Sequence, residues 1–237
     1  GQAEGNFPSH IIPKTDEPMI QSYQQFLKSM LTRGDEYYAS TKMDGSSGTF
    51  YKFNDHIGVC SRNLELKTDN TLPGYHEDRW LRVYEKYGIR EKLLKYNKNI
   101  ALQGEVYGPG IQNNNAGSPD VRMQLFNIWD IDNMRYLDFD EFMAVAKELD
   151  IPTVEILFEG KYDAFGGDIT SEAYYEELGK ATNKEMERLI ALAETLKYPN
   201  GHAAEGMVIR PKKNYSIKGY RVSFKVLNNK YLLSEKD

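Results

Sequence analysis

The sequence lacks the features of secreted and membrane-spanning proteins. Cys60 is the only cysteine, so an intrachain disulfide is impossible and we expect a reducing, intracellular compartment. No apolar run reaches the roughly 18 residues that a membrane-spanning helix needs, and the N-terminus has no apolar signal core. We therefore expect no membrane partner. The first residue is glycine rather than methionine, which we interpret as the start of an excised domain.

The sequence also lacks an overall basic charge, internal repeats and low-complexity tracts. Lysine and arginine number 30 against 35 aspartate and glutamate residues, which gives a net charge of -5. Proteins that bind nucleic acid usually carry a basic surface, so the average charge argues mildly against tight binding of RNA or DNA, although local basic patches can persist in an acidic chain. A hydrophobic share of 40% is ordinary for a globular enzyme.

Hydrophobic periodicity predicts a mixture of helices and strands. The predicted helices cover residues 19–33, 77–97 with a break near Gly88, 139–146, and 171–197 in one or two pieces. The predicted strands cover residues 36–42, 48–53, 56–60, 99–107, 122–131, 205–211 and 220–227, and residues 1–17 are expected to be extended. Strands come first, then helices, then strands again. This order favours an α+β fold with mostly antiparallel sheets flanked by helices over a doubly wound fold.

The stretch "STKMDGSSGTF", residues 40–50, contains the first candidate for chemistry. Lys42 ends a predicted strand, and a lysine amine that is partly buried near another cation is more readily neutral and nucleophilic. The motif by itself does not decide between this role and a solvated lysine in a turn. Segments farther along the chain bear on the choice.

Polar or aromatic side chains recur at the ends of other predicted strands. They are Arg62 in "CSRN", Glu105 in "LQGEVYGPGIQNN", Trp129 in "LFNIWDI", Glu205 in "AAEGMVIRP" and Lys225 in "VSFKVLNNK". Taken singly, Trp129 suits a packed core, and Arg62 and Glu205 suit exposed strand ends. Glu105 is harder to explain in that way, because a carboxylate that closes so apolar a strand needs a partner or water. Together the segments indicate a nucleotide-binding site.

In this order, the segments resemble the covalent lysyl-nucleotidyltransferase superfamily of ATP-dependent polynucleotide ligases and capping enzymes. The resemblance covers residues 40–230, and "GEVYGPGIQNN" is similar to RNA ligases of the T4 RNA ligase 2 type. The segments "FPSHIIPKTDEPMIQ" and "SFKVLNNKYLL" resemble nick-sealing RNA ligases of the Deinococcus and Naegleria kind. The resemblance implies one nucleotidyltransferase (ATP-grasp-like ligase) domain over residues 1–237. It also implies an N-terminal oligonucleotide-binding domain outside this chain.

The resemblance also implies the reaction and its partners. The lysine would attack ATP to form a lysyl-AMP, the AMP would pass to an RNA 5′-phosphate, and a 3′-OH would then displace it. ATP and a divalent metal, magnesium or manganese, are the expected cofactors. The expected partner is a pair of RNA ends or a nicked duplex, and we expect the protein to be a monomer.

Residue roles follow from the same resemblance. Lys42 would be the nucleophile, Lys225 would neutralise the α-phosphate, and Arg62 would contact phosphate or ribose. Glu105 would accept hydrogen bonds from the ribose, and Trp129 would stack on adenine. The remaining expected positions are Glu205 for a metal, directly or through water; Asp44 for orienting the turn or for the metal; and Thr41, Met43, Gly45 and Val208 for the nucleotide.

The last candidate site residues are glycines, serines and asparagines. Gly45 and Gly48 would give a phosphate room beside the lysine, because glycine lets the backbone approach a ligand closely. Ser46 and Ser47 are candidate hydroxyl donors, and Ser47 is also a candidate RNA contact. The run Asn113–Asn115 most simply forms a turn, and contact with RNA, through Asn113 and Asn114, is the alternative.

One position departs from the family pattern, and rival functions stay open. The last motif of the family has a second basic residue where this chain has Leu227, so the second cation would come from Lys230, Lys218 or Arg210, or be missing. The rivals are a DNA ligase, a GTP-using capping enzyme, and a non-catalytic nucleotide- or RNA-binding module. The segment "GPGIQNN" disfavours the first two.

Overall fold

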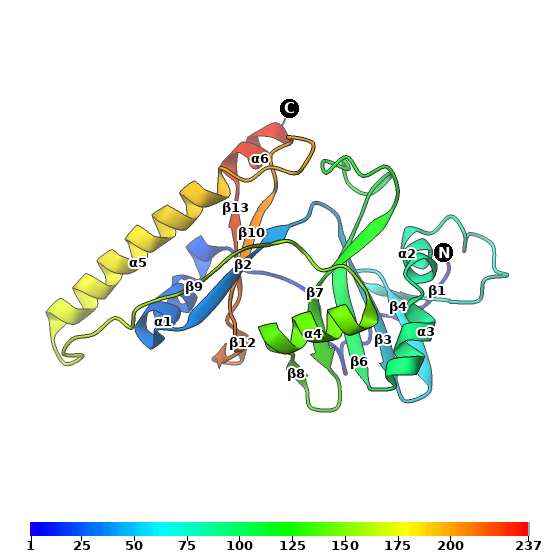
Figure 1. Ribbon diagram of the computed structural model, residues 1–237, viewed down its shortest axis with the longest axis horizontal. Coiled ribbons are helices and arrows are strands. Elements are labelled where there is room, and N and C mark those ends of the chain that lie inside the picture. The colour runs from blue at the N-terminus through cyan, green and yellow to red at the C-terminus, as the bar shows by residue number, and fades with distance from the viewer. Residues whose placement is uncertain (237) are drawn as a thin grey trace. The chain divides into compact units, whose positions relative to one another are not determined.

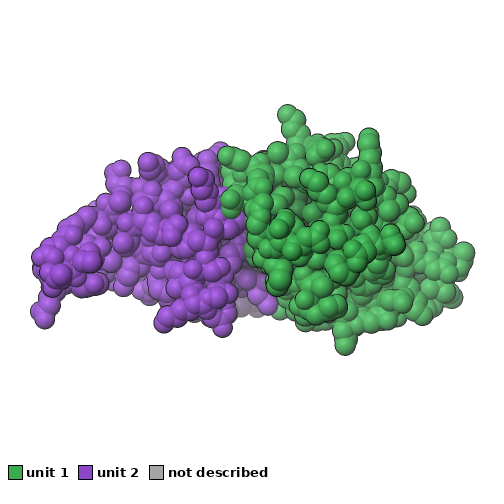
Figure 2. Space-filling model, turned by 90° about the horizontal axis from the view of Figure 1, so that it is seen from below, with its two compact units in different colours: residues 1–15, 44–154 green, residues 16–43, 155–237 purple. Residues whose placement is uncertain are grey.

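The computed structural model describes residues 1–236, and the chain divides into two units (Figures 1 and 2). Unit 1 consists of Gly1–Thr15 and Asp44–Val154. Unit 2 consists of Asp16–Met43 and the chain from Glu155 onward. The chain therefore begins in unit 1, crosses to unit 2, returns and crosses again. Each unit has its own sheet and its own hydrophobic core.

Unit 1 is built on a seven-stranded antiparallel sheet with the order β1-β5-β4-β3-β6-β7-β8. Three helices pack against the sheet through a core that includes Phe50, Leu102 and Met123, all fully buried. The strands are β1 (Ala3–Asn6), β3 (Ser46–Phe53), β4 (His56–Cys60), β5 (Leu64–Leu66), β6 (Ile100–Tyr107), β7 (Arg122–Asp130) and β8 (Arg135–Tyr136). The helices are α2 (Arg79–Lys86), α3 (Ile89–Tyr96) and α4 (Phe139–Leu149).

The opposite face of the unit 1 sheet is covered by the N-terminal segment. Phe7 and Ile12 of this segment pack with Tyr51, Cys60 and Ala101 of the sheet in a small separate core. Successive side chains of a strand point to opposite faces, so β3 and β6 alternate between the two cores. The sheet face under the N-terminal segment also carries Ser47 and Glu105, two of the predicted site residues.

Unit 2 is built on a four-stranded sheet with the order β13-β10-β2-β9. Helices α1 (Gln24–Arg33) and α5 (Glu172–Ala193) contact each other and cover a core that includes Met207, Ile209 and Phe224. The strands are β2 (Glu36–Lys42), β9 (Ile156–Lys161), β10 (Gly206–Pro211) and β13 (Phe224–Leu227). A short helical turn (Ile20–Ser22), the hairpin strands β11 (Ser216–Ile217) and β12 (Tyr220–Arg221), and α6 (Asn229–Ser234) complete the unit.

The predicted α+β class with mostly antiparallel sheets is confirmed. The predicted break near Gly88 separates α2 from α3, and this glycine has the left-handed φ of 58° that a side chain would disfavour. Residues 171–197 contain one helix, α5, rather than two. Strand β9 was not expected from the sequence. None of the helices within residues 1–236 is long and apolar enough to cross a membrane.

Candidate functional site

The register of the unit 2 sheet places the two predicted catalytic lysines on one face. Gly206 of β10 lies opposite Lys42 on β2 and opposite Leu227 on β13. Lys225 lies two residues before Leu227, and side chains two apart on a strand point to the same face. The other face of these strands packs into the unit 2 core through residues such as Met207 and Phe224. The lysines therefore face away from that core.

Lys42 forms an ion pair with the acidic residue predicted for the metal. The Lys42 Nζ lies 3.9 Å from Glu205 Oε1, and the two side chains are 22% and 23% exposed. Glu205 is adjacent to Gly206, the residue that pairs with Lys42 across the sheet. A side chain at Gly206 would collide with the Val226 carbonyl oxygen on the neighbouring strand. Glycine at this position thus permits the close strand pairing that brings Glu205 to Lys42.

A buried tyrosine fixes the backbone on both sides of this ion pair. The Tyr198 hydroxyl donates to the Lys42 carbonyl oxygen at 2.9 Å and accepts from the Glu205 N–H at 3.2 Å. Tyr198 is 3% exposed. Asn228 donates its backbone N–H to the Glu205 carbonyl oxygen at 2.9 Å. Neither Tyr198 nor Asn228 was expected from the sequence, because both act on backbone atoms rather than within a recognisable motif.

Three other predicted nucleotide-binding residues lie on unit 2. The Thr41 N–H donates to the Glu155 carbonyl oxygen at 2.9 Å, and its hydroxyl donates to the Glu155 carboxylate at 3.4 Å. Val208 lies between Ser40 and Lys225 in one row across the three strands. Met43 is 7% exposed. Val208 therefore shares the sheet face of the lysines, whereas the Thr41 side chain points to the opposite face.

Three residues were alternatives for the second cation that Leu227 does not supply, and the structure places them differently. Arg210 is buried and paired with Glu17 at 2.6 Å, and it lies four residues along β10 from Gly206, or about 13 Å at strand spacing. Lys218 lies in the turn between β11 and β12. Lys230 is exposed in the first turn of α6, directly after β13. Of the three, only Lys230 immediately follows the strand that carries Lys225.

On unit 1, Asp44 is held by Asn115, the last asparagine of the run 113–115. Asn115 Nδ2 donates to Asp44 Oδ2 at 2.8 Å, and Asp44 is 6% exposed. Asn114, which was a candidate RNA contact, instead closes its own loop: its amide donates to the Ser118 carbonyl oxygen and accepts the Ser118 N–H. This arrangement is the turn-forming alternative. Asn113 is exposed in the same loop.

Gly45 and Gly48 have a packing reason in addition to the room for a phosphate expected from the sequence. A Cβ at Gly45 would collide with the Val106 carbonyl oxygen, and one at Gly48 would lie 2.8 Å from Val106 Cγ2. Close packing against β6 therefore already requires glycine at both positions, without any phosphate. The Ser47 hydroxyl shares a 2.7 Å hydrogen bond with Thr15 Oγ1.

Glu105 belongs to a polar face of the unit 1 sheet. It lies in a row with Ser47 on β3 and Gln124 on β7. The next row on this face is buried and polar: the Gln103 amide donates to the Pro13 carbonyl oxygen at 2.8 Å, and Asn127 donates to Gln103 Oε1 at 3.1 Å. Arg62 is exposed in the turn between β4 and β5.

Trp129 lies farther along the same face and is engaged in packing. Its indole N–H donates to the Ile11 carbonyl oxygen at 2.9 Å, and its ring meets Tyr136 edge-on at 4.8 Å between centroids. It pairs with Ala101, four residues along β6 from Glu105, a separation of about 13 Å at strand spacing. These contacts correspond to the core-packing alternative for Trp129.

A second aromatic residue lies closer to Glu105 on the sheet. Phe126 is the extra residue of a β-bulge, because the register of β7 shifts between its pairs with Gln103 and Gly104. Bulges often re-aim side chains near active sites. Phe126 is only partly buried. It was not a candidate from the sequence, because an unbroken two-residue alternation does not reveal a bulge.

No group of three or more histidine, cysteine, aspartate or glutamate side chains within residues 1–236 could by itself hold a metal ion. A single carboxylate such as Glu205 still suits a magnesium-type ion, which commonly binds one or two carboxylates together with substrate phosphates. The donor set therefore fits a metal that arrives with a nucleotide better than a permanent metal centre.

Comparisons with known proteins place these features in a family. The RNA ligase family model matches residues 35–227. A variant of Naegleria gruberi RNA ligase solved with ATP and Mn is 28% identical, with a TM-score of 0.80, and the same ligase solved with PPi gives the same values. A variant solved with AMP and Mn is 28% identical, with a TM-score of 0.79.

Each of these similarities covers 100% of this chain and 61% or 62% of the Naegleria chain. The chain thus spans less than two thirds of the length of these solved proteins. No curated protein matches it significantly. The family model, by contrast, accounts for most of the chain and includes Lys42, Glu105, Glu205 and Lys225. The chain belongs to the RNA ligase family.

Proposed function

We propose that this chain is the catalytic domain of an ATP-dependent RNA ligase that acts through a lysyl-AMP. The observation that carries the proposal is the arrangement on unit 2. Lys42 and Lys225 share one sheet face, and Glu205 lies 3.9 Å from the Lys42 ammonium. A nucleophile, a second cation and an acid at adjoining strand ends suit phosphoryl transfer, which depends on positioning and charge neutralisation.

The proposed first step is attack of the Lys42 amine on the α-phosphorus of ATP. A nitrogen–phosphorus bond forms, the bond from the α-phosphorus to the bridging oxygen breaks, pyrophosphate leaves, and the amine gives up a proton. Glu205, as the nearest carboxylate partner of Lys42, is suited to hold that ammonium in place before the reaction. Lys225 would face the negative charge that grows on the α-phosphate.

In the two later steps, the AMP moves from Lys42 to an RNA 5′-phosphate, and a 3′-OH then attacks that phosphate and releases AMP. Each step exchanges one phosphorus bond for another, so no oxidant or reductant is needed. When bound, a divalent metal would neutralise phosphate charge, with Glu205 as its protein contact. The Naegleria ligase has been solved with ATP, AMP and Mn, which supports the same ligand classes here.

For the nucleotide, we propose Glu105 as the acceptor for the ribose hydroxyls and Arg62 as a phosphate or ribose contact, following the family resemblance. Phe126 is the better placed aromatic residue for adenine, because it adjoins the Glu105 row, whereas Trp129 is occupied by Ile11 and Tyr136. A base that stacks on an aromatic ring gains roughly 1–3 kcal/mol.

The proposed substrate is a nick in a duplex whose 3′-OH is carried by RNA. Sealing should be measured on matched nicked duplexes that differ only in whether the 3′-OH strand is RNA or DNA, with ATP or GTP and with magnesium or manganese. Sealing that requires ATP and an RNA 3′-OH supports the proposal. Sealing of DNA alone would support the DNA ligase alternative, and covalent labelling only by GTP would support the capping alternative. Absence of both sealing and labelling in folded protein would overturn the enzyme assignment.

A further inference from the structure

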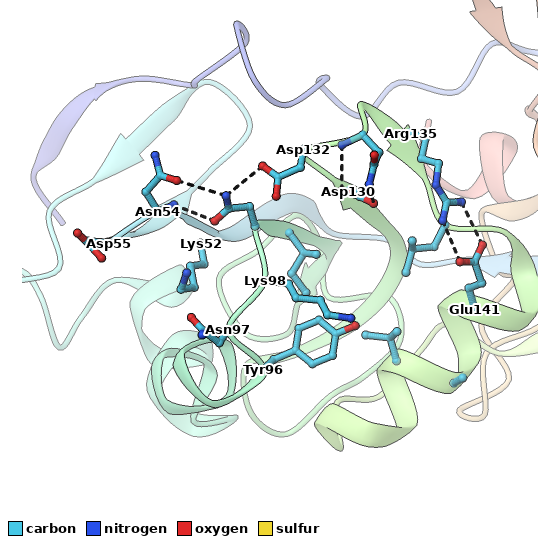
Figure 3. Close-up of a pocket in the computed structure, with 16 residues that line it drawn as sticks. Lys52, Asn54, Asp55, Tyr96, Asn97, Lys98, Asp130, Asp132, Arg135 and Glu141 are labelled. Atoms are coloured by element: carbon cyan, nitrogen blue, oxygen red, sulfur yellow. Dashed lines mark hydrogen bonds and ion pairs between the residues drawn. The ribbon is translucent and has the colours of Figure 1, made fainter.

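A cavity of about 830 Å³ lies within unit 1 and is lined by none of the predicted nucleotide-binding residues (Figure 3). Its walls are the β3–β4 turn, the loop between α3 and β6, the β7–β8 turn, and one side of α4. Its volume falls within the range of about 300–1,000 Å³ that is usual for sites of small ligands.

Hydrogen bonds between the three loops hold the rim of the cavity in place. Asn99 accepts the Asn54 N–H at 2.8 Å and donates to Asp132 Oδ1 at 3.0 Å. Asn133 donates both its backbone N–H and its side-chain amide to Asp130, at 3.1 and 2.8 Å. Figure 3 draws the bonds at Asn54, Asp132 and Asp130 as dashed lines. The cavity is therefore preformed, so a ligand need not order the loops.

The cavity wall includes a buried cation that lacks a counter-charge. Lys52 on β3 is 8% exposed, and among residues 1–236 its ammonium has neither a hydrogen-bond partner nor an ion-pair partner. Because Lys52 lines the cavity, a group that enters it can become the partner of this ammonium. An anionic group is the most effective such partner.

The cavity wall carries further groups that could contact a ligand. Lys98 places its ammonium 5.3 Å from the centre of the Tyr96 ring. The Tyr96 hydroxyl and the Asn97 side-chain amide have no hydrogen-bond partner among the described residues. A flat ring, an amide and two ammonium groups suit a ligand that carries an anion and a planar polar ring.

Four acidic residues line the wall, Asp55, Asp130, Asp132 and Glu141, and they disfavour a bare anion. Arg135 neutralises Glu141 through two hydrogen bonds of 3.1 and 2.9 Å, whereas Asp130 and Asp132 accept hydrogen bonds from neutral asparagine amides. Each of these two carboxylates keeps unused acceptor positions. A phosphate alone would be repelled by them. A phosphate that brings hydroxyl donors, as a ribose diol does, would be attracted.

We propose that this cavity binds a ribonucleotide unit, with its phosphate at Lys52 and Lys98, its base beside Tyr96, and its ribose hydroxyls on Asp130 or Asp132. The unit is either a free mononucleotide or one nucleotide of an RNA strand. Both sources present the same chemistry. The site is separate from ATP activation, so binding here does not depend on Lys42.

The test uses amide NMR spectra of the full chain, read at Asn54, Asn97 and Asn99. The probes are AMP, dAMP, inorganic phosphate and a short single-stranded RNA with 5′-OH ends. The variants are Lys52→Met, Lys98→Met and, as a matched control, Lys95→Met, which removes an exposed lysine of α3 outside the cavity. Removing the unpaired charge of Lys52 is expected to leave the fold intact, and thermal melting checks this.

We expect AMP or the RNA to shift these amides in a saturable way and dAMP to bind several-fold more weakly. Lys52→Met should weaken binding at least tenfold, Lys98→Met less, and Lys95→Met not at all. If the RNA shifts these amides, the cavity binds one nucleotide of an RNA strand. If only AMP shifts them, the cavity binds a free mononucleotide. Three results would overturn the proposal: no shift with either ligand, shifts that persist in folded Lys52→Met, or equal binding of inorganic phosphate and AMP.

Discussion

The hydroxyl group of Tyr198 joins the backbone at Lys42 to the backbone at Glu205, donating to the carbonyl oxygen of the first at 2.9 Å and accepting from the N–H of the second at 3.2 Å. The ion pair between these two side chains thus depends on a residue distant in sequence from Lys42. Tyr198 is a positioning residue, because it acts through the backbone of the residues that are proposed to meet the nucleotide.

Tyr198→Phe tests this role. Losing the hydroxyl leaves a carbonyl and an N–H without that partner, which should lower the free energy of unfolding by about 1–3 kcal/mol. It should also slow formation of the lysyl-AMP about tenfold at saturating ATP, with little change in the KM for ATP, a rate loss worth about 1.4 kcal/mol. Tyr175→Phe is the matched control, since Tyr175 is 61% exposed. A Tyr198→Phe protein that loses stability but keeps the full rate would show a purely structural role.

Phe126 and Trp129 make a contrasting pair on one strand. Phe126→Ala should raise the KM for ATP by about tenfold or more, because a stacked base contributes roughly 1–3 kcal/mol. Trp129→Ala should instead lower the melting temperature, since it removes the contacts with Ile11 and Tyr136; large aromatic-to-alanine changes in cores cost about 3–5 kcal/mol. Steady-state kinetics and thermal melting of both variants check this. A stable Trp129→Ala protein with weakened ATP use would instead support stacking of adenine on Trp129.

Glu17 and Arg210 form a largely buried ion pair on the same sheet face as the lysines. Burial by itself raises the pKa of Glu17, but the charges of Arg210 and Arg221 and hydrogen bonds from Ser223 and Arg210 hold that pKa below its ordinary value of 4.5. A lowered pKa means that the ionised form stabilises the fold. That contribution is present above about pH 4.5 and is lost as the pH falls through the lower folded-state pKa.

Glu17→Gln should therefore destabilise the protein at neutral pH, by about 3–5 kcal/mol, because Arg210 keeps its buried charge without this counter-charge. The difference from the unmodified chain should shrink in acid. Urea unfolding of both proteins at neutral pH and at a pH of about 3 measures it. A destabilisation that does not change with pH would argue that packing, rather than charge, accounts for the effect.

The positions of polar residues at strand ends could be predicted from the sequence, because each of them adjoins a strongly apolar run. Lys42, Glu105 and Lys225 all lie at or near the ends of the strands expected for them. The alternation of side chains along a strand then places Lys42 and Lys225 on one face once the register is known. The register itself could not be predicted, because it depends on pairing between segments far apart in the sequence.

Other features had no signal in the sequence pattern. Strand β9 was missed because it is an edge strand with partly exposed, charged positions, "ILFEGK", which lack a clear apolar face. Tyr198 acts through a single hydroxyl on backbone atoms, and backbone partners leave no trace in residue type. The packing reason for Gly45 also left no trace in the sequence, because the Val106 carbonyl oxygen that occupies the space of a side chain there belongs to a strand distant in sequence.

The proposed nucleophile, Lys42, can be tested by covalent labelling. The folded chain is incubated with ATP labelled at the α-phosphate and a divalent metal, and label on the protein is then read by denaturing electrophoresis. Lys213→Ala, which removes an exposed lysine of unit 2, is the matched control for Lys42→Ala. We expect label on the unmodified chain and on Lys213→Ala, and none on folded Lys42→Ala. If label persists on Lys42→Ala, or if no nucleotide labels the unmodified chain, Lys42 is not the nucleophile that accepts AMP.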